Sequence, residues 1–292
     1  MDIVITFVNG LDPVWQADYQ KHTNVPILEK RFRDWGTLKY LFRGIAKNMP
    51  FIRKVHLVVS GESQVPEWIN REEVNVVLHS DIIPKEYLPT FNSNTIEMHL
   101  HRIEGLDEEF VYFNDDLFPM MPIEPTDFFR EGKGVIAMSH HILAIDMFKK
   151  ICRNSDHLVR EALGLPRTIC FLRPQHTCVP MLKSENEWLY NKMKTKILGS
   201  LSQTRQSQNV TQYIFTNSLF LKGLIIDERQ SKKHFSMAVA GESKIQSFIE
   251  NPTRKLMCIN DVKLSDERYN AMRQMIHTEM ERQFTQTSKY ER

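Results

Sequence analysis

Residues 110–116 set a short apolar run directly before an amide and two adjacent carboxylates. Residues 110–113 are aromatic or β-branched, so they predict a buried strand whose end presents Asn114, Asp115 and Asp116. Two neighbouring carboxylates repel each other unless a cation or a shared proton relieves them, which favours a divalent metal that holds a phosphorylated ligand. The alternative is an ordinary turn at the end of the strand, because Asn and Asp readily adopt turn geometry.

Two arginines precede a predicted helix. Arg31 and Arg33 lie just before the expected helix cap at Asp34, and the free N–H groups of a helix N-terminus attract anions. A diphosphate would suit this position. Two exposed arginines beside a cap would give the same pattern.

Glu97 and His101 are four residues apart in a second predicted helix and would share one face of it. The pair would suit a metal or a tuned acid and base. The competing interpretation is structural, with Glu97 ordering the preceding loop.

Three further polar residues follow apolar or rigid segments. His176 lies between two prolines in residues 174–180, which predicts a constrained loop and a histidine able to move a proton for phosphate chemistry. Arg205 lies in a polar stretch without a local partner. Asp261 follows the apolar residues 256–259, so it could supply another metal ligand. For Arg205 and Asp261 the spacing alone favours solvated surface and turn.

Alternating strands and helices in the first half would bring these residues together. We expect strands at 2–8, 55–59 and 74–78, and a helix from Asp34 to Asn48. A second helix would begin near Asn94, follow the loop at 90–93 and end at Gly105. Helices between such strands predict a mainly parallel, Rossmann-like α/β sheet, whose strand ends bind ligands.

The second half is predicted to be mainly helical. Residues 185–200 and 265–285 have amphipathic patterns, and strands are expected only near 224–226 and 256–259. The apolar stripe of the last helix is assigned to core packing rather than to a membrane contact. We expect one catalytic domain over residues 1–292, with a nucleotide-binding half at 1–140 and a mixed half at 141–292 that completes the site.

Composition excludes several classes of protein. The 292 residues carry a net charge of +2, which predicts neither nucleic-acid binding nor strong attraction to a membrane. Four scattered cysteines disfavour a zinc site or a disulfide framework. No apolar run is long enough to cross a bilayer and no leader pattern is recognised, so a cytoplasmic protein is expected, with peripheral attachment at the inner face of the cell membrane left open. The oligomeric state is not indicated.

Taken together, the motifs resemble those of the Stealth family, which includes bacterial capsular-polysaccharide phosphotransferases and the lysosomal-enzyme N-acetylglucosamine-1-phosphotransferase. His176 with Pro180 is similar to the third conserved region, although the proline is displaced, and Phe7 replaces the usual Trp. The other matching segments are ITFVNGLDP at 5–13, RFRD at 31–34, PEWIN at 66–70, LPTFNS at 88–93, HRIEGL at 101–106, FNDD at 113–116 and CIND at 258–261.

The resemblance implies a glycosyltransferase-A-like fold and transfer of a hexose 1-phosphate or N-acetylhexosamine 1-phosphate from a UDP-sugar to a saccharide hydroxyl. The acceptor could be a polysaccharide or a lipid-linked saccharide, and UMP would leave. Mg²⁺, or Mn²⁺, would bind through Asp115 or Asp116 with Asp261, and either a carboxylate or His176 would act as the base. The substrate-binding set comprises Asn9, Gly10, Asp12, Arg31, Arg33, Asn92, Glu97, His101 and Asn114, and Arg205 joins the catalytic group.

Two other functions compete with this hypothesis. A metal-dependent glycosyltransferase would use the same donor but release UDP. A non-catalytic carbohydrate-binding protein would use the acidic residues only for turns or for sugar contacts.

Overall fold

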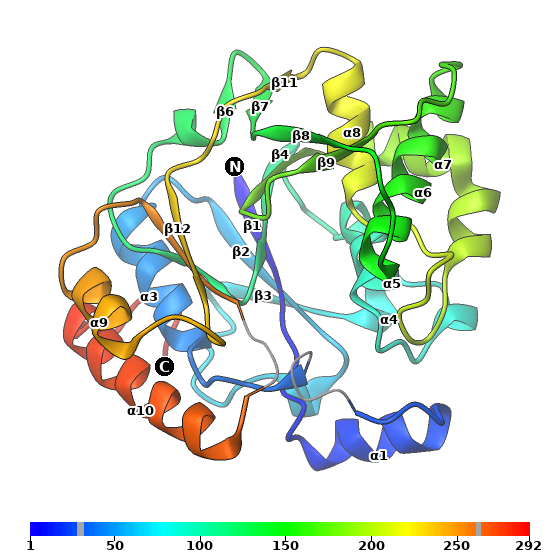
Figure 1. Cartoon of the computed structure of the whole chain (residues 1–292). Helices are drawn as coiled ribbons and strands as arrows, with labels where there is room; N and C mark the ends of the chain where they lie inside the picture. The colour runs from blue at the N-terminus through cyan, green and yellow to red at the C-terminus, as the bar shows by residue number, and fades with distance from the viewer. Residues whose placement is uncertain (28–31, 261–263) are drawn as a thin grey trace.

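A five-stranded sheet forms the centre of the molecule, with the strand order β10-β4-β1-β2-β3 (Figure 1). The computed structural model describes residues 1–27, 32–260 and 264–292. The strands are β1 (Asp2–Thr6), β2 (Lys54–Val59), β3 (Val74–Leu78), β4 (Glu109–Asn114) and β10 (Val179–Leu182). The first four run parallel, and β10 pairs antiparallel with β4. The predicted Rossmann-like α/β class, with a mainly parallel sheet, is confirmed.

Alternating side chains divide the central strands between two hydrophobic cores. In β1, Ile3 and Ile5 face one core, whereas Val4 faces the other. In β4, Phe113 joins the first core and Tyr112 the second. Because every one of these side chains is buried, the sheet is covered on both faces, as a parallel sheet requires.

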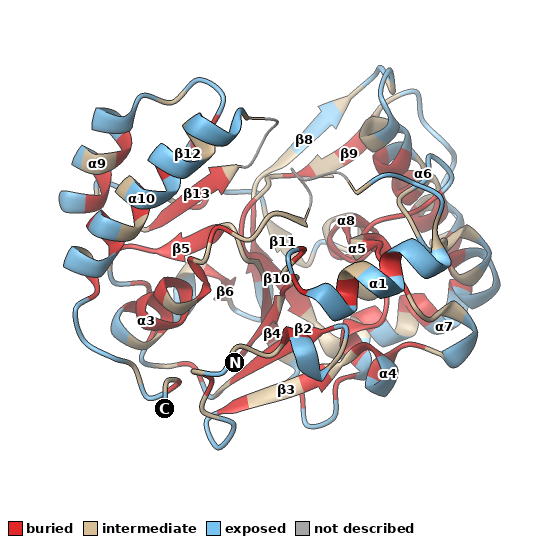
Figure 2. Cartoon of the chain, turned by 90° about the horizontal axis from the view of Figure 1, so that it is seen from below, coloured by how far each residue is buried: buried red, intermediate tan, exposed pale blue. Residues whose placement is uncertain are grey.

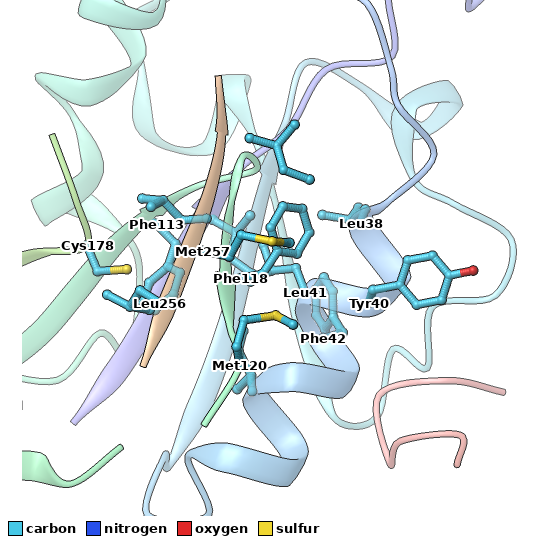
Figure 3. Packing of buried hydrophobic residues seen from close by; sticks show 14 of the residues in the cluster. Leu38, Tyr40, Leu41, Phe42, Phe113, Phe118, Met120, Cys178, Leu256 and Met257 are labelled. Carbon is cyan, nitrogen blue, oxygen red and sulfur yellow. The ribbon is translucent and has the colours of Figure 1, made fainter. Parts of the chain in front are cut away.

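The first core lies between the central sheet, a smaller sheet and three helices (Figure 3). The smaller sheet has the order β12-β13-β5. Its members and the helices are β5 (Leu117–Pro119), β12 (Lys232–Ser236), β13 (Leu256–Asn260), α3 (Leu38–Asn48), α9 (Glu242–Glu250) and α10 (Asp266–Gln283). Ser265 caps α10, and Met272, Ile276 and Met280 are buried in this core, which confirms that the stripe of the last helix serves packing.

The opposite face is covered mainly by helices of the second half. The second half supplies α6 (Met147–Ala162), α7 (Lys183–Ser200) and α8 (Tyr213–Leu221), and the first half adds the short helices α4 (His79–Ile82) and α5 (Ser93–Glu97). Figure 2 shows α6 and α7 with buried and exposed sides, whereas α5 and α8 contain no exposed residue. Helix α1 (Pro13–His22) and the short strands β6 (Phe129–Arg130), β7 (Lys133–Val135), β8 (Met138–His141), β9 (Phe171–Pro174) and β11 (Ile225–Ile226) complete the regular structure.

Two helix boundaries differ from the sequence-based prediction. Asp34 does not cap α3, because Gly36 adopts a φ of +69° and the helix begins only after Thr37. The carboxylate of Asp34 instead accepts a hydrogen bond from the Gly36 amide at 2.7 Å. The helix expected from Asn94 to Gly105 is shorter than predicted, because α5 ends at Glu97 and a separate 3-10 turn follows at Leu100–Arg102. The N-cap of α5 is Asn92.

The C-terminal residues are fastened to α3 by a buried ion pair. Arg43 and Glu291 are each 7% exposed, and Arg43 Nη2 lies 2.8 Å from Glu291 Oε2. Arg43 also donates to the Phe284 carbonyl and to the half-exposed Glu281.

Several features concern the chain as a whole. All four cysteines are free thiols, and three of them are buried. Among the described residues, no helix is long and apolar enough to cross a membrane. Location in the cell therefore stays a prediction. The division at residue 140 also stays a prediction, although β10 and β13 from beyond it pair with β4 and β5 from before it.

Candidate active site

A cavity of about 350 Å³ opens at the carboxyl ends of the parallel strands. Its lining includes Thr6 at the end of β1, Ser60 after β2, His79 after β3 and Asp115 after β4. From β1 the strand order runs one way to β2 and β3 and the other way to β4. Ligands of open α/β sheets bind at such a reversal of strand order, so the cavity occupies the position that the topology favours.

Asp116 lies at the centre of the polar cluster in this cavity. Its Oδ2 atom is 3.3 Å from His176 Nε2 and accepts a hydrogen bond from Cys258 Sγ at 3.5 Å. The backbone carbonyl of Asp116 accepts from the Ile259 amide, which ties the end of β4 to β13. Oδ1 of Asp116 is buried and has no hydrogen-bond partner among the described residues. Asp116 therefore has one carboxylate oxygen available for a cation or a substrate.

His176 lies in the turn between β9 and β10, and Gln230 holds this turn in place. The buried Gln230 amide donates to the carbonyls of Val135 and Cys178, both at 2.9 Å, and accepts from the Thr177 hydroxyl at 2.7 Å. Lys232 Nζ also donates to the carbonyl of His176. The imidazole remains about one-third exposed at 37%, so it can reach a ligand in the cavity.

Arg205 enters the cavity from a loop that is bonded to the loop at residues 90–93. Arg205 Nη2 donates to Ser93 Oγ at 2.7 Å, and Asn92 Nδ2 donates to Asn209 Oδ1 at 3.0 Å. Asn92 is 1% exposed and caps α5 by accepting from the Asn94 amide. Arg205 and Asn92 both line the cavity, so the structure brings these two predicted residues to the carboxylates.

Arg33 lines the cavity on the side of α10. Its guanidinium carbon lies 4.4 Å from the centre of the Tyr269 ring, and Asp34 lines the cavity beside it. Burial raises the pKa of the Asp34 carboxyl. Arg31 and Asp261 lie outside the described residues.

Asn9, Gly10 and Asp12 shape the first loop and do not line the cavity, in contrast to their neighbours Thr6, Phe7 and Val8. A Cβ atom on Gly10 would lie 2.3 Å from the Phe32 carbonyl oxygen, so only glycine fits there. Asp12 caps α1 and accepts hydrogen bonds from Ser63 and Gln64, both at 2.7 Å. Burial opposes ionisation of Asp12, yet these bonds lower its pKa below the usual value. The Asn9 amide donates to Gln64 at 2.6 Å.

Glu97 and His101 are not paired on one helix face, because the helix ends between them. Glu97 accepts from the Thr211 hydroxyl at 3.1 Å and the Gln212 amide at 3.3 Å, which orders that loop. The His101 ring packs 4.8 Å from the ring of Tyr190, and burial lowers its pKa to about 3. Neither residue lines the cavity.

Sequence reasoning missed His79, Ser60 and Cys258 as members of the site region. His79 is 6% exposed, lines the cavity and makes no side-chain hydrogen bond to any described residue. Burial lowers its pKa to about 4, so the ring is neutral near pH 7. Their positions could have predicted that Ser60 and His79 lie at the site, because each directly follows the last residue of a strand.

Comparison with known proteins identifies the family. Residues 31–136 match the family model described as Stealth protein CR2, conserved region 2. The chain is 46% identical to the receptor polysaccharide phosphotransferase WefC of Streptococcus oralis, over 89% of this chain and 90% of that protein. The chain belongs to the Stealth family. This confirms the resemblance found in the sequence motifs.

Two further matches are a second phosphotransferase and a solved structure. The capsular polysaccharide phosphotransferase WcwK of Streptococcus pneumoniae is 31% identical over 90% of each chain. Among solved structures, the inositol-1-phosphate CTP transferase of T. maritima gives a TM-score of 0.39 at 15% identity and 96% coverage of each chain.

Proposed function

We propose that this Stealth protein is a phosphotransferase that moves a hexose 1-phosphate or N-acetylhexosamine 1-phosphate from a UDP-sugar to a saccharide hydroxyl, releasing UMP during synthesis of a capsular or other cell-surface polysaccharide. The observation that carries the proposal is the cavity at the reversal of strand order, where Asp115 and Asp116 lie with His176 and Arg205. Relatives named polysaccharide phosphotransferases support the reaction class and the polymer.

We infer an orientation of the donor from the strand order. The ends of β4 and β3 are three strand spacings apart, which is about 14 Å. With the pyrophosphate between Arg33 and Arg205 beside the β4 end, an extended donor reaches Ser60 and His79 with its base. Guanidinium groups suit phosphate oxygens because they donate two parallel hydrogen bonds.

The donor atoms at the end of β4 fit a hard divalent cation. Asp116 Oδ1 is buried without a partner among the described residues, and Asp115 and Asn114 offer further oxygen atoms in the same cavity. Asp116, His176 and Cys258 have ligand atoms within 4.8 Å of one another. Burial raises the pKa of the Cys258 thiol, so the thiol stays protonated and donates to Asp116.

Carboxylate oxygens without a thiolate favour Mg²⁺ or Mn²⁺ over zinc. Such an ion, held by Asp115 and Asp116, would polarise the sugar-side phosphate and offset its charge. Asp261 stays a predicted further ligand.

His176 is proposed as the base. With its Nε2–H donating to Asp116, the Nδ1 atom accepts the proton of the acceptor hydroxyl, and the carboxylate stabilises the imidazolium that forms. The acceptor oxygen then bonds to the sugar-side phosphorus, and the bond from that phosphorus to the bridging oxygen breaks. Arg33 and Arg205 offset the charge on the departing UMP.

The test is identification of the released nucleotide. Purified protein is incubated with a panel of UDP-hexoses and UDP-N-acetylhexosamines, saccharide acceptors and Mg²⁺ or Mn²⁺. Chromatography of the nucleotide should show UMP in proportion to a phosphodiester detected by phosphorus NMR. Stoichiometric UDP would instead establish a glycosyltransferase, and saccharide binding without donor turnover would establish a carbohydrate-binding protein.

A further inference from the structure

A strip of exposed aliphatic side chains lies at one end of the β8–β9 ladder, away from the cavity lining. The strip consists of Ile142, Leu143, Ile145, Met147 and Ile169, which are 60%, 67%, 75%, 41% and 83% exposed. These five make up half of the ten exposed large hydrophobic residues in the described part of the chain. Monomeric proteins scatter such residues singly, so a concentration of this kind marks an interaction surface.

The two segments of the strip are neighbours because of the strand register. β8 and β9 pair antiparallel and end with His141 opposite Phe171, whose rings stack at 5.7 Å. Figure 1 shows the two strands side by side, with the chain leading from β8 into α6. Leu143 lies two residues after His141 and Ile169 two residues before Phe171, so both segments of the strip adjoin this terminal pair.

The surroundings of the strip are basic. Residues 138–175 contain six Lys and Arg residues against three Asp and Glu residues, whereas the entire chain has a net charge of only +2. All three acidic groups are paired: Asp156 with Arg160, Asp146 with Lys149 at 3.9 Å, and Glu161 with Lys196 from outside the segment. Four of the six basic groups of the segment are left outside these pairs.

Three of these four basic groups are available to a ligand. Lys150, Arg153 and Arg167 are exposed and form no ion pair with any described residue. Lys150 and Arg153 are one turn apart near the N-terminus of α6, next to Met147, and Arg167 is two residues from Ile169. The strip is thus flanked by cations on both of its segments.

We propose that this strip docks the protein on the surface of an anionic lipid bilayer. Aliphatic side chains beside Lys and Arg are the pattern of segments that lie in the headgroup region, where burial of apolar surface and attraction to anionic lipids act together. Attachment is peripheral, since no described helix could span a membrane.

The docking surface bears on the proposed transfer, on which this step rests. β9 leads from Phe171, next to the strip, to Pro174, and His176 follows in the turn, so the five residue steps span at most about 17 Å. A saccharide acceptor attached to a membrane lipid therefore meets the cavity from the membrane side.

The experiment is flotation of the full chain with vesicles of phosphatidylglycerol and phosphatidylcholine, compared with vesicles of phosphatidylcholine alone. We expect binding to the anionic vesicles, release by high salt, and at least a tenfold loss of partitioning for Ile142→Ser combined with Ile145→Ser. Lys150→Glu combined with Arg153→Glu should lower binding similarly. Val239→Ser is the matched control, because Val239 is 83% exposed elsewhere and should leave partitioning unchanged.

Each outcome decides the proposal. Absence of vesicle binding by the unmodified protein overturns it, as does equal binding by the Ile142 and Ile145 variant. An oligomer that this variant dissociates, without vesicle binding, would assign the strip to a protein interface. Release of UMP with a short water-soluble acceptor should be unchanged in all variants, so loss of docking and failure of the proposed transfer are distinguished by separate assays.

Discussion

Replacing His79 with Phe tests whether the nucleobase of the donor binds to the cavity at the β3 end. The ring of His79 makes no hydrogen bond to a described residue and is neutral near pH 7. Phe fills a similar volume and leaves no protein group unpaired, so the folded state should lose little stability. Any loss of activity in this variant would then come from a lost contact between His79 and the ligand.

The expected magnitude follows from one hydrogen bond. Leaving a buried polar atom of the base without its partner costs about 2 kcal/mol, which corresponds to about a 30-fold rise in the KM for the UDP-sugar. The kcat should change little, because His79 is three strand spacings from Asp115 at the β4 end. Inhibition by free UMP should weaken by the same factor, whereas the KM for the acceptor should stay constant.

Initial rates of UMP release across donor concentrations provide the measurement. His22→Phe is the control, because His22 is an exposed histidine at the end of α1. An unchanged donor KM together with unchanged inhibition by UMP would refute the placement of the nucleobase beside His79. A fall in kcat alone would show that His79 acts on the chemical step instead.

Three further predictions concern chemistry and stability. Asp116→Asn keeps the side-chain shape but removes the charge beside His176, so kcat/KM should fall at least about 10³-fold. Glu291→Gln leaves Arg43 with a weaker buried partner and should cost about 3 kcal/mol in the free energy of unfolding, measured by urea denaturation. Burial lowers the pKa of histidines such as His99 to about 4, whereas the pKa in the unfolded chain is 6.5. Their contribution to the free energy of unfolding is therefore complete above pH 6.5 and is lost as the pH falls toward 4. Each such histidine should cost about 2 kcal/mol between pH 7 and pH 5.

Matched variants separate these effects from general damage. Asp127→Asn changes a carboxylate that pairs with Lys255 outside the cavity, so kcat/KM should be retained. Glu281→Gln changes the half-exposed partner of Arg43 and should cost less than about 1 kcal/mol. A free energy of unfolding that is flat from pH 7 to pH 5 would contradict the neutral state of the buried histidines. Activity of Asp116→Asn within tenfold of the unmodified protein would remove Asp116 from the proposed chemistry.

The sequence predicted the central strands well because they are long, apolar and bounded by polar residues. Residues 74–78 form β3 as expected, and the polar residues after β4 lie at the sheet edge that ligands favour. The roles of Asn9 and Asp12 were harder to predict, since a carboxylate that caps a helix and one that faces a cavity have the same local sequence. The hydrogen bonds from Ser63 and Gln64 to Asp12 cross more than fifty positions of the chain.

Other features depended on contacts that no local pattern contains. β10 is only four residues long and has no alternation of polar and apolar side chains, because it is buried against β4. Helix α5 stops at Glu97, whose carboxylate accepts hydrogen bonds from Thr211 and Gln212 in a distant loop. The contact between Cys258 and Asp116 likewise joins two sheets and could not be read from either segment alone.

The two sides of the cavity differ in how they are anchored, and this difference affects how the family can diversify. The His176 turn is fixed through Gln230, which leaves little freedom for the groups that would perform the chemistry. Across the cavity, Trp15 and Phe91 pack with Tyr19 in a small hydrophobic cluster separate from both main cores. Under the proposed function, substitutions there would reshape the space for a sugar while leaving the sheet and the His176 turn undisturbed, so new polymer structures could arise without changes to the residues proposed for the chemistry.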